Sequence, residues 1–303
     1  MTTTHAVRLT LALVVGLASA APAVAQQRIL GPEERARQQA EQERRLQEEL
    51  KAPRPIEAAY SVWLEELTWM EIRDAMAAGK TTVIVPTGGI EQNGPYVALG
   101  KHNYVLQGAC EAIARALGDA LCAPIVKFVP EGNIERPTGH MRYPGTISLR
   151  QETFEAILDD IGSSLKAHGF THIIYIGDSG GNQAGMKAVA ERQNARWGRP
   201  VAYFIAEFYD YPGVRAYMER ELGIMQGDDG IHDDYQITAL MMTVDPTVVR
   251  YDQRVKAGKA TINGVSIAPK EKTIEVGKKL MQFRVDVTVK AIHEALARAG
   301  AQD

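Results

Sequence analysis

The stretch VIVPTGGIEQNGP, residues 83–95, decides the fold class. Its first half continues an apolar run over 82–86, which has the length and composition of a strand that is buried on both faces. Its second half is a glycine-rich loop that carries the carboxylate of Glu91. Strands without polar alternation are typical of parallel sheets, because helices cover both faces of such sheets.

Similar apolar runs alternate with helical patterns along the rest of the chain. We expect further strands at 124–129, 172–176 and 201–208. Helices are expected at 103–117, 151–168 and 183–196, and a last packing helix at 280–295. This alternation predicts an α/β fold with a mostly parallel sheet flanked by helices on both faces.

The first residues have the pattern of an export signal. An apolar run over 9–21 ends at Pro22, and small residues at Ala23 and Ala25 form a cleavage pattern. The run is short for a bilayer of about 30 Å, which argues against an uncleaved anchor. We therefore predict a Sec signal peptide over 1–25, cleaved near Ala25, and a mature protein that is secreted or periplasmic without a membrane anchor.

The next segment, residues 26–55, is rich in Glu, Arg and Gln and predicts a solvated charged tether or helix. The globular α/β domain is expected to occupy 56–303. The formal net charge of the chain is -3 and the charges are mixed in sign, so the sequence indicates no nucleic-acid partner.

Two cysteines, Cys110 and Cys122, lie in the predicted domain. An exported protein meets an oxidising compartment, where a disulfide can form. Burial as free thiols is the alternative, and the sequence does not choose between the two.

Polar clusters follow the predicted strands at 86–95 and 177–182, and a third opens a helix at 227–234. Ligands of open parallel sheets bind beyond the carboxyl ends of the strands, where such clusters converge. Glu91, His102 and Asp178 offer oxygen and nitrogen donors that suit zinc or manganese. We predict these three residues as metal ligands.

The peptide GDSGG at 177–181 is also found around the nucleophilic serine of chymotrypsin-like proteases. Those enzymes are all-β, whereas this peptide lies between a buried strand and a helix. A helix cap by Asp178 or Ser179 in a glycine-rich turn is the structural alternative. A metal-free hydrolase that uses Ser179 with a histidine and an aspartate is the least favoured hypothesis.

Five blocks of the sequence, in order, resemble the motifs of the creatininase family. They are 83–95, 139–148, 173–182, 230–238 and 269–277, within a region from Trp63 to Ala299. The second, GHMRYPGTIS, is similar to E-H-x-x-F-P-G-T-I-S, and the third ends in GDSGGN where the family has N-G-H-G-G-N. Their order is more specific than any single motif. The resemblance implies a creatininase-like α/β fold and metal-dependent hydrolysis of a small or cyclic amide, by a protein that forms homo-oligomers.

The resemblance also implies roles for individual residues. Glu91 matches a ligand glutamate, and His140 and His232 match histidines near the site. His232 is expected to transfer protons or to donate a hydrogen bond in the transition state. Asp178 is expected, from its place after a strand, to be a second catalytic residue. The side chains expected to contact the substrate are Asn93, His140, Ser179 and Asn182.

Several positions depart from the family pattern. Asn93 and Ser179 stand where ligand histidines are expected, His102 replaces a bridging aspartate, Tyr96 replaces a histidine, and Ile237 replaces a glutamate. Without a bridging carboxylate, two cations repel each other at close distance, so a two-metal centre is not expected. Two hypotheses follow: an amidohydrolase with an altered single-metal site that acts on an amide other than creatinine, or a catalytically inactive binding or assembly protein.

Overall fold

The computed structural model describes residues 31–228 and 232–301, so the predicted signal peptide lies outside the described residues. The chain divides into two units. The first ends at Pro53 and contains the helix α1 (Pro32–Lys51), and the second begins at Arg54. No residue of α1 is buried, and its charged side chains pair along the helix, as Arg44 does with Glu41. The charged segment is therefore a solvated helix over this range.

A four-stranded parallel sheet forms the centre of the second unit. Its strands lie in the order β2-β1-β3-β4, and each neighbouring pair is parallel. The strands are β1 (Thr82–Thr87), β2 (Ala120–Cys122), β3 (His172–Gly177) and β4 (Ala202–Phe204). The predicted α/β class with a parallel sheet is thus confirmed.

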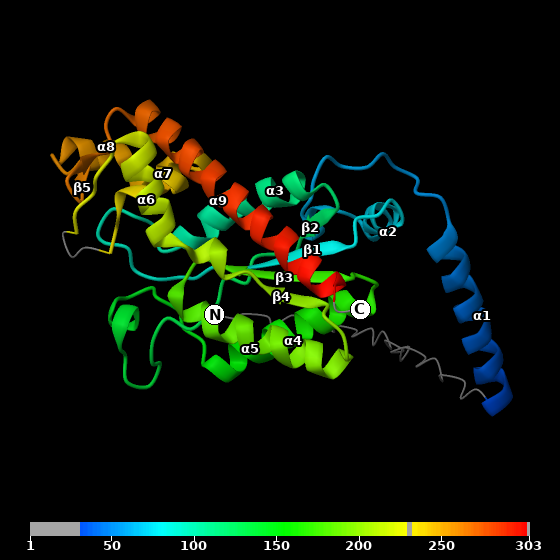
Figure 1. Cartoon of the computed structure of the whole chain (residues 1–303). Coiled ribbons are helices and arrows are strands. Elements are labelled where there is room, and N and C mark those ends of the chain that lie inside the picture. The colour runs from blue at the N-terminus through cyan, green and yellow to red at the C-terminus, as the bar shows by residue number, and fades with distance from the viewer. Residues whose placement is uncertain (1–30, 229–231, 302–303) are drawn as a thin grey trace, which may run out of the picture. The chain divides into compact units, whose positions relative to one another are not determined.

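Helices cover both faces of this sheet (Figure 1). On one face lie α3 (Lys101–Leu117) and α9 (Lys270–Gly300), and on the other lie α4 (Gln151–Ala167) and α5 (Gln183–Trp197). The remaining helices are α2 (Trp69–Ala77), α6 (Tyr211–Leu222), α7 (Tyr235–Val244) and α8 (Tyr251–Lys256). A short antiparallel pair, β5 (Thr261–Ile262) and β6 (Val265–Ser266), follows α8.

The register of the two central strands determines where the loops meet. β1 and β3 pair residue by residue from Thr82 opposite His172 to Thr87 opposite Gly177. Because the strands are parallel and end together, the loops that start at Gly88 and Asp178 leave the sheet side by side. The polar clusters after these two strands therefore share one edge of the sheet.

Two of the predicted strands are placed differently. The strand expected at 124–129 lies earlier, at β2, and the later stretch forms isolated bridges at Val126 and Val129. Pro124 lacks the N–H that a ladder requires, which explains the interruption. The strand expected at 201–208 is limited to β4, because the chain then turns into a short 3₁₀ helix, Ala206–Tyr209, that buries Phe208.

Apolar side chains gather in two buried clusters. One surrounds the sheet and includes Val85, Ile174 and Phe154, and the other lies among α6, α7 and α9 and includes Leu240 and Leu280. The partly buried Met281 of α9 packs against both clusters. The helix α9 thus connects the sheet layer to the C-terminal helices.

Cys110 and Cys122 form a disulfide, with their Cα atoms 6.3 Å apart. The bond joins α3 to β2, and both residues are fully buried. Of the two alternatives that the sequence leaves open, the structure contains the disulfide.

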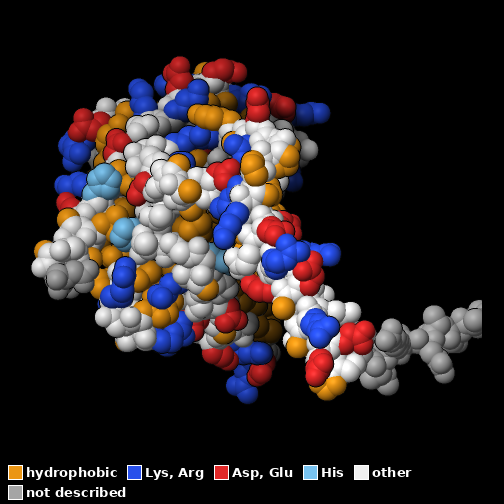
Figure 2. All heavy atoms as spheres, turned by 90° about the vertical axis from the view of Figure 1, so that its right-hand side faces the viewer, with side chains coloured by type: hydrophobic (Ala, Val, Ile, Leu, Met, Phe, Trp, Pro, Cys, Tyr) orange, Lys and Arg blue, Asp and Glu red, His pale blue; other side chains and the backbone are white. Residues whose placement is uncertain are grey.

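The surface carries charges of both signs. On the face seen in Figure 2, Lys and Arg side chains are interspersed with Asp and Glu side chains. The absence of a nucleic-acid partner stays a prediction that rests on this mixture. Among the described residues, no helix is both long and apolar enough to cross a membrane.

A glycine permits the close packing of α9 on α7. A Cβ atom at Gly277 would lie 2.0 Å from the backbone oxygen of Ala239. We expect Gly277→Ala to force the two helices apart and to lower the free energy of unfolding by about 1–3 kcal/mol. Urea denaturation measures this change. Gly300→Ala is the matched control in the same helix, because no atom lies within 4 Å of its added Cβ, and an equal loss in both variants would contradict the packing explanation.

Candidate active site

A cavity of about 670 Å³ opens beyond the carboxyl ends of β1 and β3. Its polar lining comes from loops that are far apart in the sequence. It includes Glu91, Lys101, His102, Glu131, His140, Ser179, Tyr209, Tyr211, Arg215 and His232. The apolar side chain of Ile237 also lines it. The site therefore lies where the strand-end argument places it.

Glu91 lies at the centre of the polar groups. Its Oε1 atom is 2.7 Å from His102 Nε2, 2.9 Å from His232 Nε2 and 3.2 Å from Lys101 Nζ. Its Oε2 atom is 3.3 Å from His140 Nε2. One buried carboxylate is thus surrounded by four nitrogen-bearing side chains from separate segments of the chain.

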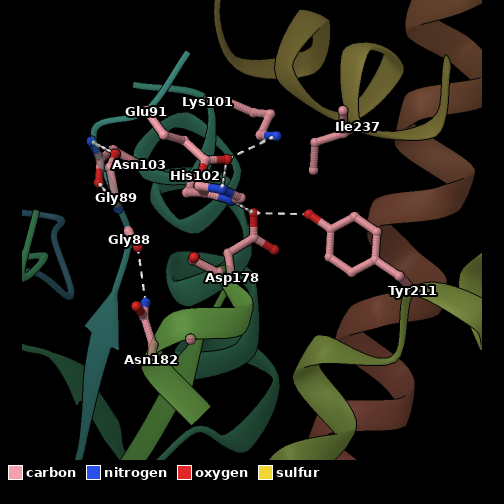
Figure 3. A network of polar contacts seen from close by, with 12 residues as sticks. Gly88, Gly89, Glu91, Lys101, His102, Asn103, Asp178, Asn182, Tyr211 and Ile237 are labelled. Carbon is pink, nitrogen blue, oxygen red and sulfur yellow. Dashed lines mark hydrogen bonds and ion pairs between the residues drawn. The ribbon is translucent and has the colours of Figure 1, made fainter. Parts of the chain in front are cut away.

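A chain of contacts continues from His102 into the interior (Figure 3). The second ring nitrogen, Nδ1, lies 2.8 Å from Asp178 Oδ2, so the imidazole stands between two carboxylates. Asp178 is fully buried, and its other oxygen accepts a 2.6 Å hydrogen bond from Arg284 of α9. Tyr211 donates a 3.3 Å hydrogen bond to Asp178 Oδ2. These contacts fix the ring of His102 and, through it, Glu91.

The electrostatics follow from these contacts. Burial alone would raise the pKa of Glu91, but hydrogen bonds from His102 and His232 hold it well below its usual range. Burial likewise opposes ionisation of Asp178, but the charge of Arg284 and the contact with His102 lower its pKa. Both carboxylates are therefore held in the ionised form.

Glu131 behaves in the opposite way. Burial and then the charge of Glu91 raise the pKa of Glu131 to about 9. Its Oε2 atom accepts a long 3.5 Å hydrogen bond from Ser179, and no donor among the described residues reaches its Oε1 atom. Two carboxyl groups side by side, with one ionised and one neutral, are a frequent arrangement in hydrolytic sites.

Glycines allow the loops to approach this closely. A Cβ atom at Gly89 would lie 2.2 Å from Glu131 Oε1, and one at Gly181 would lie 2.2 Å from the backbone oxygen of Pro130. Asn103 of α3 ties the first loop in place, because its Nδ2 donates a 3.0 Å hydrogen bond to the backbone oxygen of Gly89. The entry of α3, which carries Lys101 and His102, is thereby fixed against the loop after β1.

Most of the residues predicted from the sequence meet in this cavity. Glu91, His102, His140, Ser179 and His232 line the cavity. Asp178 does not line it, but it contacts His102, which in turn contacts Glu91. Asn93 and Asn182 do not line the cavity either. Asn93 donates to the backbone oxygens of Glu91 and Ala98, and Asn182 donates to those of Thr87 and Gly88. Both buried amides hold loops in shape.

Several residues that line the site were not predicted, among them Glu131 and Lys101 beside Glu91. Glu131 comes shortly after Val129, the last residue of a predicted strand. Its place after a strand could therefore have indicated a site residue. Lys101 directly precedes His102, and no sequence signal distinguishes it from a lysine on the surface. Its burial, with 5 % of the residue exposed, becomes apparent from the fold.

Three side chains can converge on one ion. Glu91, His140 and His232 each offer a ligand atom, and these atoms lie within 4.8 Å of one another. Two imidazoles and a carboxylate are a set that holds catalytic zinc and leaves a coordination position open. The predicted group of Glu91, His102 and Asp178 is less open, because both nitrogens of His102 already face carboxylates. The side chains present therefore fit one divalent ion at the first group.

Comparison with known proteins gives concordant results. Creatinine amidohydrolase from Pseudomonas putida is 24% identical over 218 residues, which cover 69% of this chain and 82% of that protein. Mycofactocin precursor peptide peptidase from Mycolicibacterium smegmatis is 26% identical over 125 residues, which cover 38% of this chain and 48% of that protein.

The fold is shared with solved creatininases. A crystal structure of creatinine amidohydrolase (creatininase) superimposes with a TM-score of 0.56 at 21% identity, over 79% of this chain and 98% of that chain. The sequence profile of the creatininase family, described as creatinine amidohydrolase, matches residues 65–292, which is most of the second unit. The chain belongs to the creatininase family.

Proposed function

We propose that this protein is an amidohydrolase that cleaves the C–N bond of a small or cyclic amide with one divalent ion, zinc or manganese. The observation that carries the proposal is the convergence of Glu91, His140 and His232 in the wall of a large polar cavity. Family membership supports the reaction class. The relatives with solved structures include one described as a manganese creatininase and a mutant described as the Zn-Zn type.

In this proposal Glu91, His140 and His232 hold the ion. A divalent ion in such a site polarises a carbonyl group and lowers the pKa of water to about 7. His102 and Asp178 orient the carboxylate of Glu91, and Arg284 keeps Asp178 ionised. Outer contacts of this kind fix the geometry and the basicity of ligands.

Hydrolysis adds one water molecule across the amide. The water oxygen bonds to the carbonyl carbon, the C–N bond breaks, and one proton of the water ends on the leaving nitrogen. Glu131 is placed to transfer that proton, because it lines the cavity beside Glu91. Its raised pKa leaves it a neutral acid, which can give its proton to the leaving nitrogen and recover one from the water. The sequence predicted this role for His232, which the present proposal assigns to the ion.

One ion, rather than two, agrees with the residues at the family positions. Ser179 and Ile237 line the cavity but offer neither an imidazole nor a carboxylate. The position of the bridging aspartate is taken by His102, whose ring lies between Glu91 and Asp178. These changes alter the walls around the substrate, so we propose an amide other than creatinine.

We also propose that the protein acts outside the cytoplasm. The pattern over residues 1–25 is that of a Sec signal peptide, and a disulfide between Cys110 and Cys122 is typical of exported proteins. Assembly as a homo-oligomer is proposed from the family resemblance.

Metal content tests the ligand set. We expect about one zinc or manganese ion per chain in the purified protein, and loss of the ion in His140→Ala and in His232→Ala, because each removes one of three ligands. Mass spectrometry of the metal in dialysed protein measures the stoichiometry. His293→Ala is the matched control, because this exposed histidine of α9 lies outside the cavity.

Retention of the ion in both histidine variants would contradict this ligand set and favour the group of Glu91, His102 and Asp178. Folded wild-type protein that binds no ion and hydrolyses no amide would favour the alternative class, an inactive binding or assembly protein. A panel of small linear and cyclic amides, with creatinine among them, completes the measurement.

A further inference from the structure

A buried ammonium group stands beside the proposed ion site. Lys101, the first residue of α3, is 5 % exposed, and no other lysine among the described residues is buried. Its Nζ atom lies 3.2 Å from Glu91 Oε1 and 3.1 Å from His232 Nε2. Burial of an ammonium group is costly unless partners compensate for the lost hydration.

The environment of Lys101 has one unusual property. Both of these partners belong to the three side chains that converge as a candidate ion site. The ammonium group also lines the cavity, so it faces the space open to a substrate. An ammonium group has three N–H donors. With an ion on His232, the contact of Lys101 with Glu91 would remain, and other N–H donors would be available to a ligand in the cavity.

We propose that Lys101 supplies a fixed second positive charge at this site, in place of a second metal ion. This inference rests on the proposed function. The charge limits the centre to one divalent ion, because a further cation would meet the ammonium group in a buried setting. It also stabilises the carbonyl oxygen of the substrate when the attack of water moves an electron pair of the C=O bond onto that oxygen.

The lysine keeps its proton throughout this step. The electron pair returns to form the C=O bond as the C–N bond breaks, and the leaving nitrogen takes its proton from the water. The role of Lys101 is therefore electrostatic, and it requires a permanent positive charge near both Glu91 and the cavity.

The proposal predicts opposite changes in two quantities. In Lys101→Met, removal of the repelling charge should tighten the binding of Zn²⁺ by about tenfold or more, whereas kcat/KM should fall by about a hundredfold. A residue with a purely structural role would weaken both. Titration of chelator-stripped protein with Zn²⁺ measures affinity and stoichiometry, and hydrolysis of the best amide of the panel measures kcat/KM.

Three further variants serve as controls. Lys101→Arg keeps the charge, so its affinity for Zn²⁺ should stay within about threefold of the wild type. Lys101→Gln removes the charge but keeps a hydrogen-bonding group. It should also bind Zn²⁺ more tightly and have a lower kcat/KM, and it replaces Lys101→Met in the test if Lys101→Met does not fold. Lys80→Met removes a lysine that bonds to the backbone oxygen of Gly118, away from the cavity, and should change neither quantity.

The outcomes separate the two proposals. Wild-type protein that binds one ion, with unchanged or weaker binding in both uncharged variants, overturns the role of Lys101 and leaves the ion site standing. Wild-type protein that binds two ions also overturns it. Wild-type protein that binds no ion contradicts the proposed function, and this inference with it.

Discussion

Asp178→Asn is expected to lower the free energy of unfolding by about 3–5 kcal/mol, as for other buried ion pairs from which one charge is removed. Asp178 and Arg284 are both buried, and their atoms lie 2.6 Å apart. The guanidinium group also packs over the rings of Phe208 and Tyr211. Without the carboxylate, the charge of Arg284 would be left in the interior with neutral acceptors alone, such as the backbone oxygen of Phe208.

The pH of the measurement follows from the pKa of Asp178, which lies below its ordinary value of 3.8. A carboxyl group whose pKa is lowered by folding contributes its stability above the unfolded pKa. The contribution is lost as the pH falls through the folded pKa. Urea denaturation at pH 7 therefore measures the full loss in the free energy of unfolding. The difference in this free energy between wild type and Asp178→Asn should shrink under strongly acidic conditions.

A surface ion pair provides the matched control. Atoms of Asp159 and Arg196 lie 2.8 Å apart, close to the 2.6 Å of the buried pair, but both side chains are partly exposed. Asp159→Asn should cost about 1 kcal/mol or less, because water and salt screen exposed charges. A similar loss in the two variants would show that burial does not govern the Asp178 pair.

Glu91→Gln should have the largest effect on activity. The change keeps the shape of the side chain but removes the charge that four nitrogen-bearing groups face. Loss of an outer-shell partner typically costs about 10–100-fold in metal affinity or activity, and loss of a ligand charge should exceed that range. We therefore expect no stoichiometric ion and a fall in kcat/KM of about a thousandfold or more.

Metal analysis and amide hydrolysis by the same preparation test this prediction. Glu152→Gln, an exposed glutamate of α4, is the control for loss of a carboxylate as such. Activity within about threefold of the wild type in Glu91→Gln would remove Glu91 from the catalytic centre. Circular dichroism shows whether the variant is folded, since the unbalanced charges of its neighbours also disfavour the native state.

The sequence predicted correctly where the two central strands end, but it did not predict where the strand near Pro124 lies. Glu91 and Asp178 could be brought together in advance, because two apolar runs of equal length predicted parallel strands that end at the same edge. By contrast, the strand that apolar composition predicted at 124–129 lies before Pro124, at β2. A proline in an apolar run can break the ladder without changing the apolarity of the stretch.

The roles of polar residues were harder to predict than their neighbourhood. Asn93 and Asn182 follow strands, as ligands do, but both amides bond to backbone oxygens. Asn93 bonds to Glu91 in its own loop, and Asn182 bonds to Gly88 in the loop after β1. Lys101 and Glu131 reach the site because the start of α3 and the loop after Val129 meet there. That meeting depends on tertiary packing, which residue type and spacing do not encode locally.

His102 illustrates the remaining gap. Its position suggested a metal ligand, and it does touch both of the carboxylates with which it was grouped. Whether an imidazole binds an ion or orients a carboxylate depends on which ring nitrogen has other contacts. His140 and His232 place their Nε2 atoms 3.3 Å and 2.9 Å from oxygens of Glu91, and the three ligand atoms can converge on one ion.

The three residues of the proposed ion site come from segments that are far apart in the chain. Glu91 follows β1, which packs in the cluster around the sheet, whereas His232 precedes α7, which packs in the C-terminal cluster. An ion shared by these residues and His140 would act as a cross-link between two separately packed cores. Unfolding of either core would release it, so the amount of folded protein in a cell would depend on the supply of free metal through mass action.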